Sequence, residues 1–247
     1  FLDAVKEKNP AAQVICSVRD ILVEKKEARN EKIAQLINER FDQVWVHSDP
    51  NVIHFKDTFS AEPKIAARIH YTGFIAEPHQ WDGPKREKKI LLSLGGGGVG
   101  LELYEAAVFL VSQFPEYHFH FVVGPYTPTP FVENLKLKLA PHGDRVVFTP
   151  LLLQFEKMLS ESALSLSLGG YNTIMNLLNT RTPALVLSYD ANQEQRIRAE
   201  ILEERGYLRL LEPNDLEPKK LKAIVEERLS AIYPSVIPDL GGAARAR

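Results

Sequence analysis

Short apolar segments alternate with amphipathic segments along the second half of the chain. The apolar segments are rich in Leu, Val, Ile and Phe, which is typical of strands buried on both faces of a parallel sheet. We predict strands at residues 89–94, 117–123, 145–149, 164–168 and 184–188. The amphipathic segments predict helices at 101–114, 131–139, 155–161, directly after Gly170, at 193–205 and at 221–232. This order predicts a doubly wound, Rossmann-like α/β domain over residues 89–240.

The first part of the chain repeats this pattern on a smaller scale. Residues 13–17 (QVICS) and 41–47 (FDQVWVH) are strand candidates, and a charged segment with helical spacing runs between them to Arg40. A third candidate lies at 68–74 (RIHYTGF). Residues 1–76 therefore form either a partial α/β domain of their own or a small extension of a single domain.

Residues 77–88 (EPHQWDGPKREK) separate the two parts. Two prolines and a glycine interrupt any periodic pattern, which is typical of a linker. Lys85, Arg86 and Lys88 are the basic residues of this segment, and Lys89 follows it. We expect these charges to be solvated rather than to form a binding site.

A glycine turn separates the apolar segment 164–168 from the next helix. Gly169-Gly170 lets the backbone turn sharply and approach a ligand closely, and Asn172 or Thr173 can cap the helix. The helix start faces the carboxyl edge of the sheet, where free N–H groups and the helix dipole favour an anion. A phosphate group fits this position, although a strand–helix unit without a ligand would have the same pattern.

A second glycine turn follows the strand predicted at 89–94. Gly95, Gly97 and Gly100 match the dinucleotide fingerprint G-x-G-x-x-G, so a nicotinamide or flavin enzyme has to be considered. That fingerprint also needs an acidic residue at the tip of the next strand, and residues 117–123 run into Gly124-Pro125 instead. The same glycines can form a backbone cradle for the diphosphate of a nucleotide sugar.

Other chemistries lack their motifs in this sequence. There is no Asp-x-Asp pair that would bridge a metal to a diphosphate, and no common hydrolase, nucleoside-triphosphatase or zinc-protease signature. His118 and His120 lie on one face of their strand, but local spacing places no third ligand. We therefore predict no metal and no cofactor, and we expect these imidazoles to form hydrogen bonds.

Composition limits the partners and the location. The 30 basic and 32 acidic side chains give a charge of −2, so bulk electrostatics do not indicate a nucleic-acid partner. Cys16 is the only cysteine, and no apolar run approaches the roughly 18 residues that cross a bilayer. We expect a cytoplasmic protein, with peripheral membrane contact left open. The chain begins with Phe1, and we expect it to be part of a longer protein.

Three segments resemble the donor-binding half of glycosyltransferases with the two-domain GT-B fold. They are residues 169–173 (GGYNT), 183–186 (PALV) and 192–195 (NQEQ). The chain is similar to family 28, and within it to predicted glycosyltransferases related to the peptidoglycan lipid I N-acetylglucosaminyltransferase. The resemblance implies a complete C-terminal donor domain, and it implies that residues 1–76 are the back half of an acceptor-side domain.

The resemblance also implies roles for individual residues. The glycine turn and helix start would hold the nucleotide diphosphate, and residues 193–195 would hold the sugar hydroxyls. Asn176 stands at the ribose position, where the peptidoglycan enzyme has Glu; its amide can still form hydrogen bonds to a ribose. The predicted nucleotide-sugar site consists of Gly95, Gly96, Gly97, Gly98, Thr149, Gly169, Gly170, Tyr171, Asn172, Thr173, Asn176, Gln193, Glu194 and Gln195.

The function expected from this resemblance is metal-independent transfer of a hexose or N-acetylhexosamine from a UDP-sugar to an unidentified acceptor. By resemblance, the main catalytic base lies in a front half that this chain lacks, so we expect little transfer by the chain alone. Asp20, beside Arg19, is the second candidate for the base, and a surface ion pair or helix cap is its alternative. A non-catalytic nucleotide-sugar-binding module and a UDP-sugar epimerase or hydrolase are the other functions left open.

Overall fold

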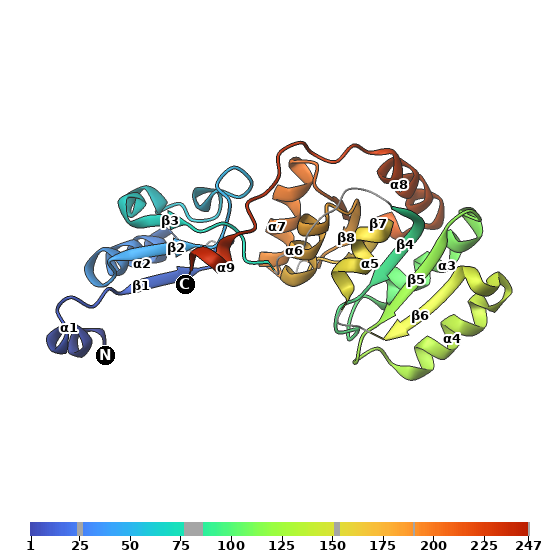
Figure 1. Ribbon diagram of the computed structural model, residues 1–247, viewed down its shortest axis with the longest axis horizontal. Helices are drawn as coiled ribbons and strands as arrows, with labels where there is room; N and C mark the ends of the chain where they lie inside the picture. The colour runs from blue at the N-terminus through green and yellow to red at the C-terminus, as the bar shows by residue number, and fades with distance from the viewer. Residues whose placement is uncertain (24–26, 77–85, 151–153, 190, 247) are drawn as a thin grey trace. The chain divides into compact units, whose positions relative to one another are not determined.

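The computed structural model describes residues 1–23, 27–76, 86–150, 154–189 and 191–246. These residues form two compact units (Figure 1). Unit 1 comprises Phe1–Ala76 and Val236–Arg247, and unit 2 comprises Glu77–Ser235. No described helix is both long and apolar enough to cross a membrane.

Unit 2 contains a six-stranded parallel sheet with the strand order β6-β5-β4-β7-β8-β9. The strands are β4 (Glu87–Ser93), β5 (His118–Val123), β6 (Val146–Pro150), β7 (Ser162–Leu168), β8 (Ala184–Leu187) and β9 (Arg209–Leu211). The chain runs from β4 to one edge, returns to β7 beside β4, and then continues to the other edge. The order reverses between β4 and β7, and in such sheets ligands bind at the carboxyl ends of the strands at this switch point.

Helices cover both faces of the sheet of unit 2 (Figure 1). They are α3 (Leu101–Gln113), α4 (Thr129–Leu139), α5 (Phe155–Glu161), α6 (Tyr171–Thr180), α7 (Gln193–Glu204) and α8 (Pro218–Ser230). Alternate strand residues such as Leu92, Phe121 and Leu166 form one buried cluster with Leu110 of α3 and Val225 of α8. Because strand side chains alternate between faces, the intervening residues face the opposite layer, where α5 packs against α6.

The predicted α/β class and the doubly wound arrangement are confirmed, and the differences are one missed strand and several element ends. The sixth strand, β9, was missed because its three residues begin with Arg209 and are too short for a periodic pattern. Helix α8 ends at Ser230, two residues before the predicted end, because Ala231 is already extended at ψ 140°. Strand β4 begins at Glu87, inside the segment that we predicted as linker.

Arg86 corrects the prediction that this basic segment is solvated. Its guanidinium is half-buried and donates hydrogen bonds to carbonyl oxygens at the C-terminal ends of α5 and α6, as well as to Thr182 Oγ1. Burial lowers the pKa of Arg86. The last carbonyl groups of a helix have no intrahelical partners. Arg86 therefore connects the start of β4 to the C-terminal ends of α5 and α6 by donating to such carbonyl groups. The rest of the predicted linker, residues 77–85, lies outside the described residues.

Unit 1 is built on a three-stranded parallel sheet with the order β1-β2-β3. Its elements are α1 (Leu2–Lys8), β1 (Ile15–Val18), α2 (Glu27–Arg40), β2 (Gln43–Val46), β3 (Ile69–Tyr71) and α9 (Gly242–Arg245). Val44 and Val46 of β2 are fully buried and pack with Ala34 of α2 and with Phe55 and Phe59 from the connection to β3. The strands lie inside the three predicted segments, except that β1 extends one residue further, to Val18.

The C-terminal segment belongs to unit 1 although it follows α8 in the sequence. The Phe74 N–H donates to the Asp239 carbonyl over 2.7 Å, and the Gly242 N–H donates to the Phe74 carbonyl over 2.9 Å. A Cβ atom at Gly242 would lie 2.2 Å from the Gly73 carbonyl oxygen, so this close approach requires glycine. Residues near both ends of the chain therefore build one unit.

Candidate functional site

A pocket of about 600 Å³ lies at the carboxyl edge of the sheet of unit 2. Its described lining comes from the loop between β4 and α3, the loop between β8 and α7, and the first turns of these two helices. The lining residues are Gly98, Val99, Gly100, Leu101, Glu102, Tyr189, Ala191, Asn192 and Gln195. Strands β4 and β8 flank β7 in the sheet. The pocket is therefore beside the switch point, where a doubly wound sheet binds its ligand.

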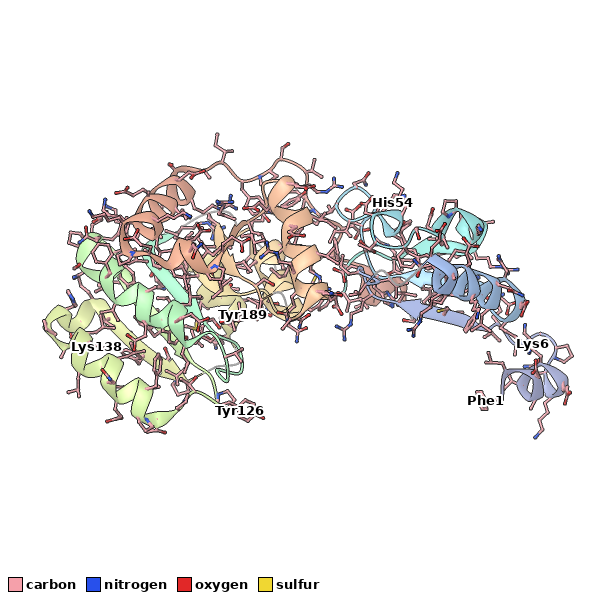
Figure 2. The ribbon with its side chains drawn as sticks, turned by 180° about the vertical axis from the view of Figure 1, so that it is seen from behind. Phe1, Lys6, His54, Tyr126, Lys138 and Tyr189 are labelled. Atoms are coloured by element: carbon pink, nitrogen blue, oxygen red, sulfur yellow. The ribbon has the colours of Figure 1, made fainter. Side chains whose placement is uncertain are left out.

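The glycine turn after β4 requires glycine for its backbone conformation. The φ angle is +81° at Gly97, and a Cβ atom there would lie 1.9 Å from Thr127 Oγ1. The turn packs against the loop after β5, since the Tyr126 N–H donates to the Gly96 carbonyl over 2.8 Å. Tyr126 itself is 75% exposed (Figure 2). This tight packing holds the neighbouring residue Gly98 at the pocket.

The start of α3 supplies backbone donors to the same pocket. Among the described residues, no acceptor is found for the N–H groups of Gly98 and Val99, and both residues line the pocket. The first-turn N–H groups of a helix also lack intrahelical partners. The β4–α3 loop can therefore donate hydrogen bonds to oxygen atoms of a ligand.

The turn between β7 and α6 has a different construction. Gly170 is the N-cap residue of α6, with φ −61° and ψ 145°, so any residue could adopt its backbone conformation. A Cβ atom at Gly170 would have Thr173 Oγ1 as its nearest neighbour, 3.9 Å away, so the space beside it is open. Gly170 has no side chain, and no side-chain cap is found at this helix start. The prediction that Asn172 or Thr173 caps α6 is therefore wrong, because both lie inside its first turn.

Arg198 of α7 places a buried positive charge beside the start of α6, and the sequence analysis did not identify it. Its side chain has no exposed surface, its Nη2 donates to Glu194 Oε1 over 2.7 Å, and its guanidinium carbon lies 5.0 Å from the ring centre of Tyr171. Guanidinium groups stack favourably on aromatic faces. The i, i+4 spacing of Glu194 and Arg198 was the available signal for their ion pair.

Tyr189 and Glu102 connect the two loops of the pocket. The Tyr189 phenol (Figure 2) donates a hydrogen bond to Glu102 Oε1. Burial, and then this bond and the negative charge of Glu102, raise the pKa of Tyr189. At the start of α7, Asn192 Oδ1 accepts from the Gln195 N–H over 3.3 Å and caps the helix. Neither Tyr189 nor Glu102 was among the predicted site residues.

The structure brings several predicted site residues together. Gly98 and Gln195 line the same pocket. The turn after β7 is next to it, because a Cβ atom at Gly100 would lie 2.7 Å from the Leu168 side chain. Asn176 is half-buried in the second turn of α6, and its carbonyl accepts from Thr180 Oγ1 over 2.7 Å. Gln193 is exposed at the start of α7.

Two predicted residues are not among the lining residues of the pocket. Thr149 is on the edge strand β6 and forms a hydrogen bond with His120, whose pKa is lowered first by burial and then by Lys89. Asp20 belongs to unit 1, follows β1 and has no exposed surface. A substrate hydroxyl could contact Asp20 only after unit 1 rearranged locally. Among the described residues, no group of three or more His, Cys, Asp and Glu side chains could hold a metal ion.

Strand order, pocket position and glycine turns together define a doubly wound, Rossmann-like domain with a pocket beside its switch point. Residues 94–232, more than half of the chain, match the family described as the glycosyltransferase family 28 C-terminal domain. The chain belongs to this family. The membership confirms the resemblance found in the sequence, and it decides against the nicotinamide or flavin enzyme that the G-x-G-x-x-G pattern had left open.

Solved structures of two glycosyltransferases and of a protein described as an epimerase have a similar fold. The glycotransferase of kitacinnamycin matches 93% of this chain with a TM-score of 0.60 at 16% identity. MurG of Acinetobacter baumannii matches 98% with a TM-score of 0.58 at 15% identity. A Listeria monocytogenes protein described as a UDP-N-acetylglucosamine 2-epimerase matches 99% with a TM-score of 0.64 at 17% identity.

These matches cover only part of the longer structures. The present chain spans 57% of the kitacinnamycin enzyme, 65% of MurG and 74% of the Listeria protein. At these identities the likeness shows the fold alone. Among curated protein sequences, none matches the chain.

Proposed function

We propose that the protein is a glycosyltransferase that transfers a hexose or N-acetylhexosamine from a UDP-sugar to an acceptor. The observation that carries the proposal is the pocket of unit 2, which combines the β4–α3 glycine turn with Asn192 and Gln195 at the switch point of a family 28 domain. Both loops offer groups that suit a nucleotide sugar. Backbone donors suit phosphate oxygens, and amide side chains can donate to and accept from sugar hydroxyls.

Local charge supports one orientation of the donor. The diphosphate would lie at the start of α6, where the helix dipole and the buried Arg198 guanidinium, stacked on Tyr171, both favour negative charge. The sugar would lie in the pocket toward Glu102 and Gln195, because a carboxylate attracts hydroxyl groups and repels phosphate. Asn176, one turn into α6, would then be available to the ribose.

The chemistry would break the bond between the sugar anomeric carbon and the diphosphate oxygen while an acceptor hydroxyl attacks that carbon. Backbone N–H groups and the α6 dipole would stabilise the charge that develops on the departing diphosphate without requiring a metal. A base on the acceptor side would take the proton of the attacking hydroxyl. Asp20 is the candidate base in unit 1, and it is fully buried there.

Calorimetry of UDP binding tests the proposal directly. The chain should bind UDP and a UDP-sugar in buffer containing a chelator, because helix and backbone donors supply the phosphate contacts. Binding that begins only after magnesium or manganese is added would contradict metal independence. Absence of binding under both conditions would remove the nucleotide-sugar function. ADP is the matched control ligand, since it has the same diphosphate and a different base.

A UDP-sugar epimerase is the second candidate function, and the observation in its favour is the similarity in fold to the Listeria protein. An epimerase would exchange the hydrogen at the sugar C2 with solvent. Incubating a UDP-N-acetylhexosamine with the chain in deuterated water and following C2 by mass spectrometry separates the two functions. Deuterium incorporation without an acceptor would favour the epimerase.

A further inference from the structure

Glu102 and Tyr189 form a polar bridge in the pocket that the proposed function does not yet explain. They are 87 residues apart in the sequence: Glu102 lies in the first turn of α3, and Tyr189 lies in the loop between β8 and α7. The Tyr189 ring also packs against the hydrophobic core of unit 2, and this packing limits its movement. The bridge therefore places the Glu102 carboxylate at a defined point of the lining.

Glu102 is the charged side chain of the described lining, and the neighbouring lining residues are neutral. Val99, Leu101 and Ala191 are apolar, and Asn192 and Gln195 have amides. The carboxylate uses one oxygen to accept from Tyr189, and no other hydrogen bond to its side chain is found among the described residues. A carboxylate can accept several hydrogen bonds, so Oε2 is available to a ligand.

We propose that Glu102, oriented by Tyr189, contacts the donor sugar and selects neutral hexoses against hexuronic acids. The inference rests on the proposed function, and it adds the charge class of the sugar. Two neighbouring hydroxyls of a neutral hexose can donate to one carboxylate, which gives charge-assisted hydrogen bonds. A uronic acid would bring a second carboxylate beside Glu102, and the two like charges would repel each other. Rejection of a competitor by repulsion is a common basis of specificity.

A structural role is the alternative for the same contacts. Glu102 lies in the first turn of α3, where an acidic residue interacts favourably with the helix dipole, and its bond to Tyr189 could only tie two loops together. Under that alternative, substitutions would change thermal stability and leave sugar selectivity unchanged. The two roles therefore predict different measurements.

The test compares the affinities of UDP, UDP-glucose and UDP-glucuronic acid by calorimetry for the wild-type chain and three variants. Glu102→Gln removes the charge and keeps the shape, and Tyr189→Phe removes the phenol that orients it. Glu105→Gln is the matched control, because it removes the same charge one turn along α3, where Glu105 pairs with Lys138 on the surface over 2.8 Å. Thermal unfolding of each variant verifies the fold.

We expect the wild-type chain to bind UDP-glucose about tenfold or more tightly than UDP-glucuronic acid. Glu102→Gln should bring this ratio close to one and leave the affinity for UDP unchanged, while Glu105→Gln should keep the wild-type ratio. Tyr189→Phe should weaken UDP-glucose several-fold relative to UDP. A wild-type chain without preference, or equal ratios in the Glu102 and Glu105 variants, would overturn the inference while leaving the proposed function intact. A chain that does not bind UDP at all would overturn both.

Discussion

The two glycine turns of unit 2 look alike in sequence and differ in construction. The turn after β4 needs glycine for its backbone, since φ is +58° at Gly95, +81° at Gly97 and +84° at Gly100. The turn after β7 does not, since φ of Gly170 is −61° and the space beside its Cα atom is open. A run of glycines therefore does not tell by itself whether the backbone conformation or a bound ligand requires the small residue.

The charges near the two turns also differ. The Glu102 carboxylate follows the first turn, and the buried Arg198 guanidinium lies beside the second. A diphosphate is negative and most sugars are neutral. We therefore expect the diphosphate of one ligand beside the turn after β7 and its sugar beside the turn after β4. The predictions below test this division, beginning with the largest expected effect.

Gly97→Ala should lower the free energy of unfolding by about 3 kcal/mol. The substitution puts a side chain at φ +81° and places Cβ 2.9 Å from the Thr127 backbone nitrogen, so both strain and overlap contribute. Gly170→Ala is the control and should change the free energy of unfolding by less than about 0.5 kcal/mol. Urea unfolding measures both. Equal losses would mean that the two turns do not differ in their need for glycine.

Gly170→Val should weaken UDP binding by about 2 kcal/mol, the range for lost hydrogen bonds to a charged group. The φ angle of −61° accepts valine, so the expected effect comes from the branched side chain occupying the approach to the α6 donors rather than from backbone strain. Calorimetry measures the affinity, and thermal unfolding should show a folded variant. An unchanged affinity would remove this turn from the diphosphate site.

Arg198→Met should weaken UDP binding by about 1–2 kcal/mol, because it removes the positive charge beside the start of α6. Arg196→Met is the matched control: it removes the same charge two residues away, where Arg196 pairs with Glu200 and Glu212. Arg198→Lys should recover part of the affinity if the charge acts on the ligand. Equal effects of the Arg196 and Arg198 substitutions would argue against a local role.

Gln195→Ala should weaken a UDP-sugar by about 1 kcal/mol and leave bare UDP unchanged, because Gln195 lines the pocket. Glu194→Ala should instead weaken UDP and UDP-sugar alike, since Glu194 pairs with Arg198 and acts through it. The sequence analysis predicted one sugar-binding group from Gln193 to Gln195. In the structure, Gln195 lines the pocket and Glu194 pairs with Arg198. If both substitutions affected only the sugar, Glu194 would contact the ligand directly.

Much of the candidate site could be predicted from the sequence because its signals are local. Each glycine turn directly follows an apolar segment, so neighbouring residues alone are enough to locate both turns. Glu102 and Tyr189 could not be predicted, because their contact joins residues 87 positions apart through the packing of two loops. Thr149 lies opposite Val122 on β5 and forms a hydrogen bond with His120, a contact that local sequence signals do not show, and its place in the site stays a prediction.

The sequence by itself determined the class of elements, their order and the family, because hydrophobic periodicity and turn residues act over a few neighbouring positions. The tertiary structure decided the strand order at the switch point, the inclusion of the short strand β9 and the burial of Arg198 and Arg86. It also decided that Gly97 adopts a positive φ angle, which favours glycine, and that Gly170 has an ordinary φ angle with open space beside it. These properties depend on contacts between segments distant in sequence, and such contacts form only when the sheet and its helices pack together.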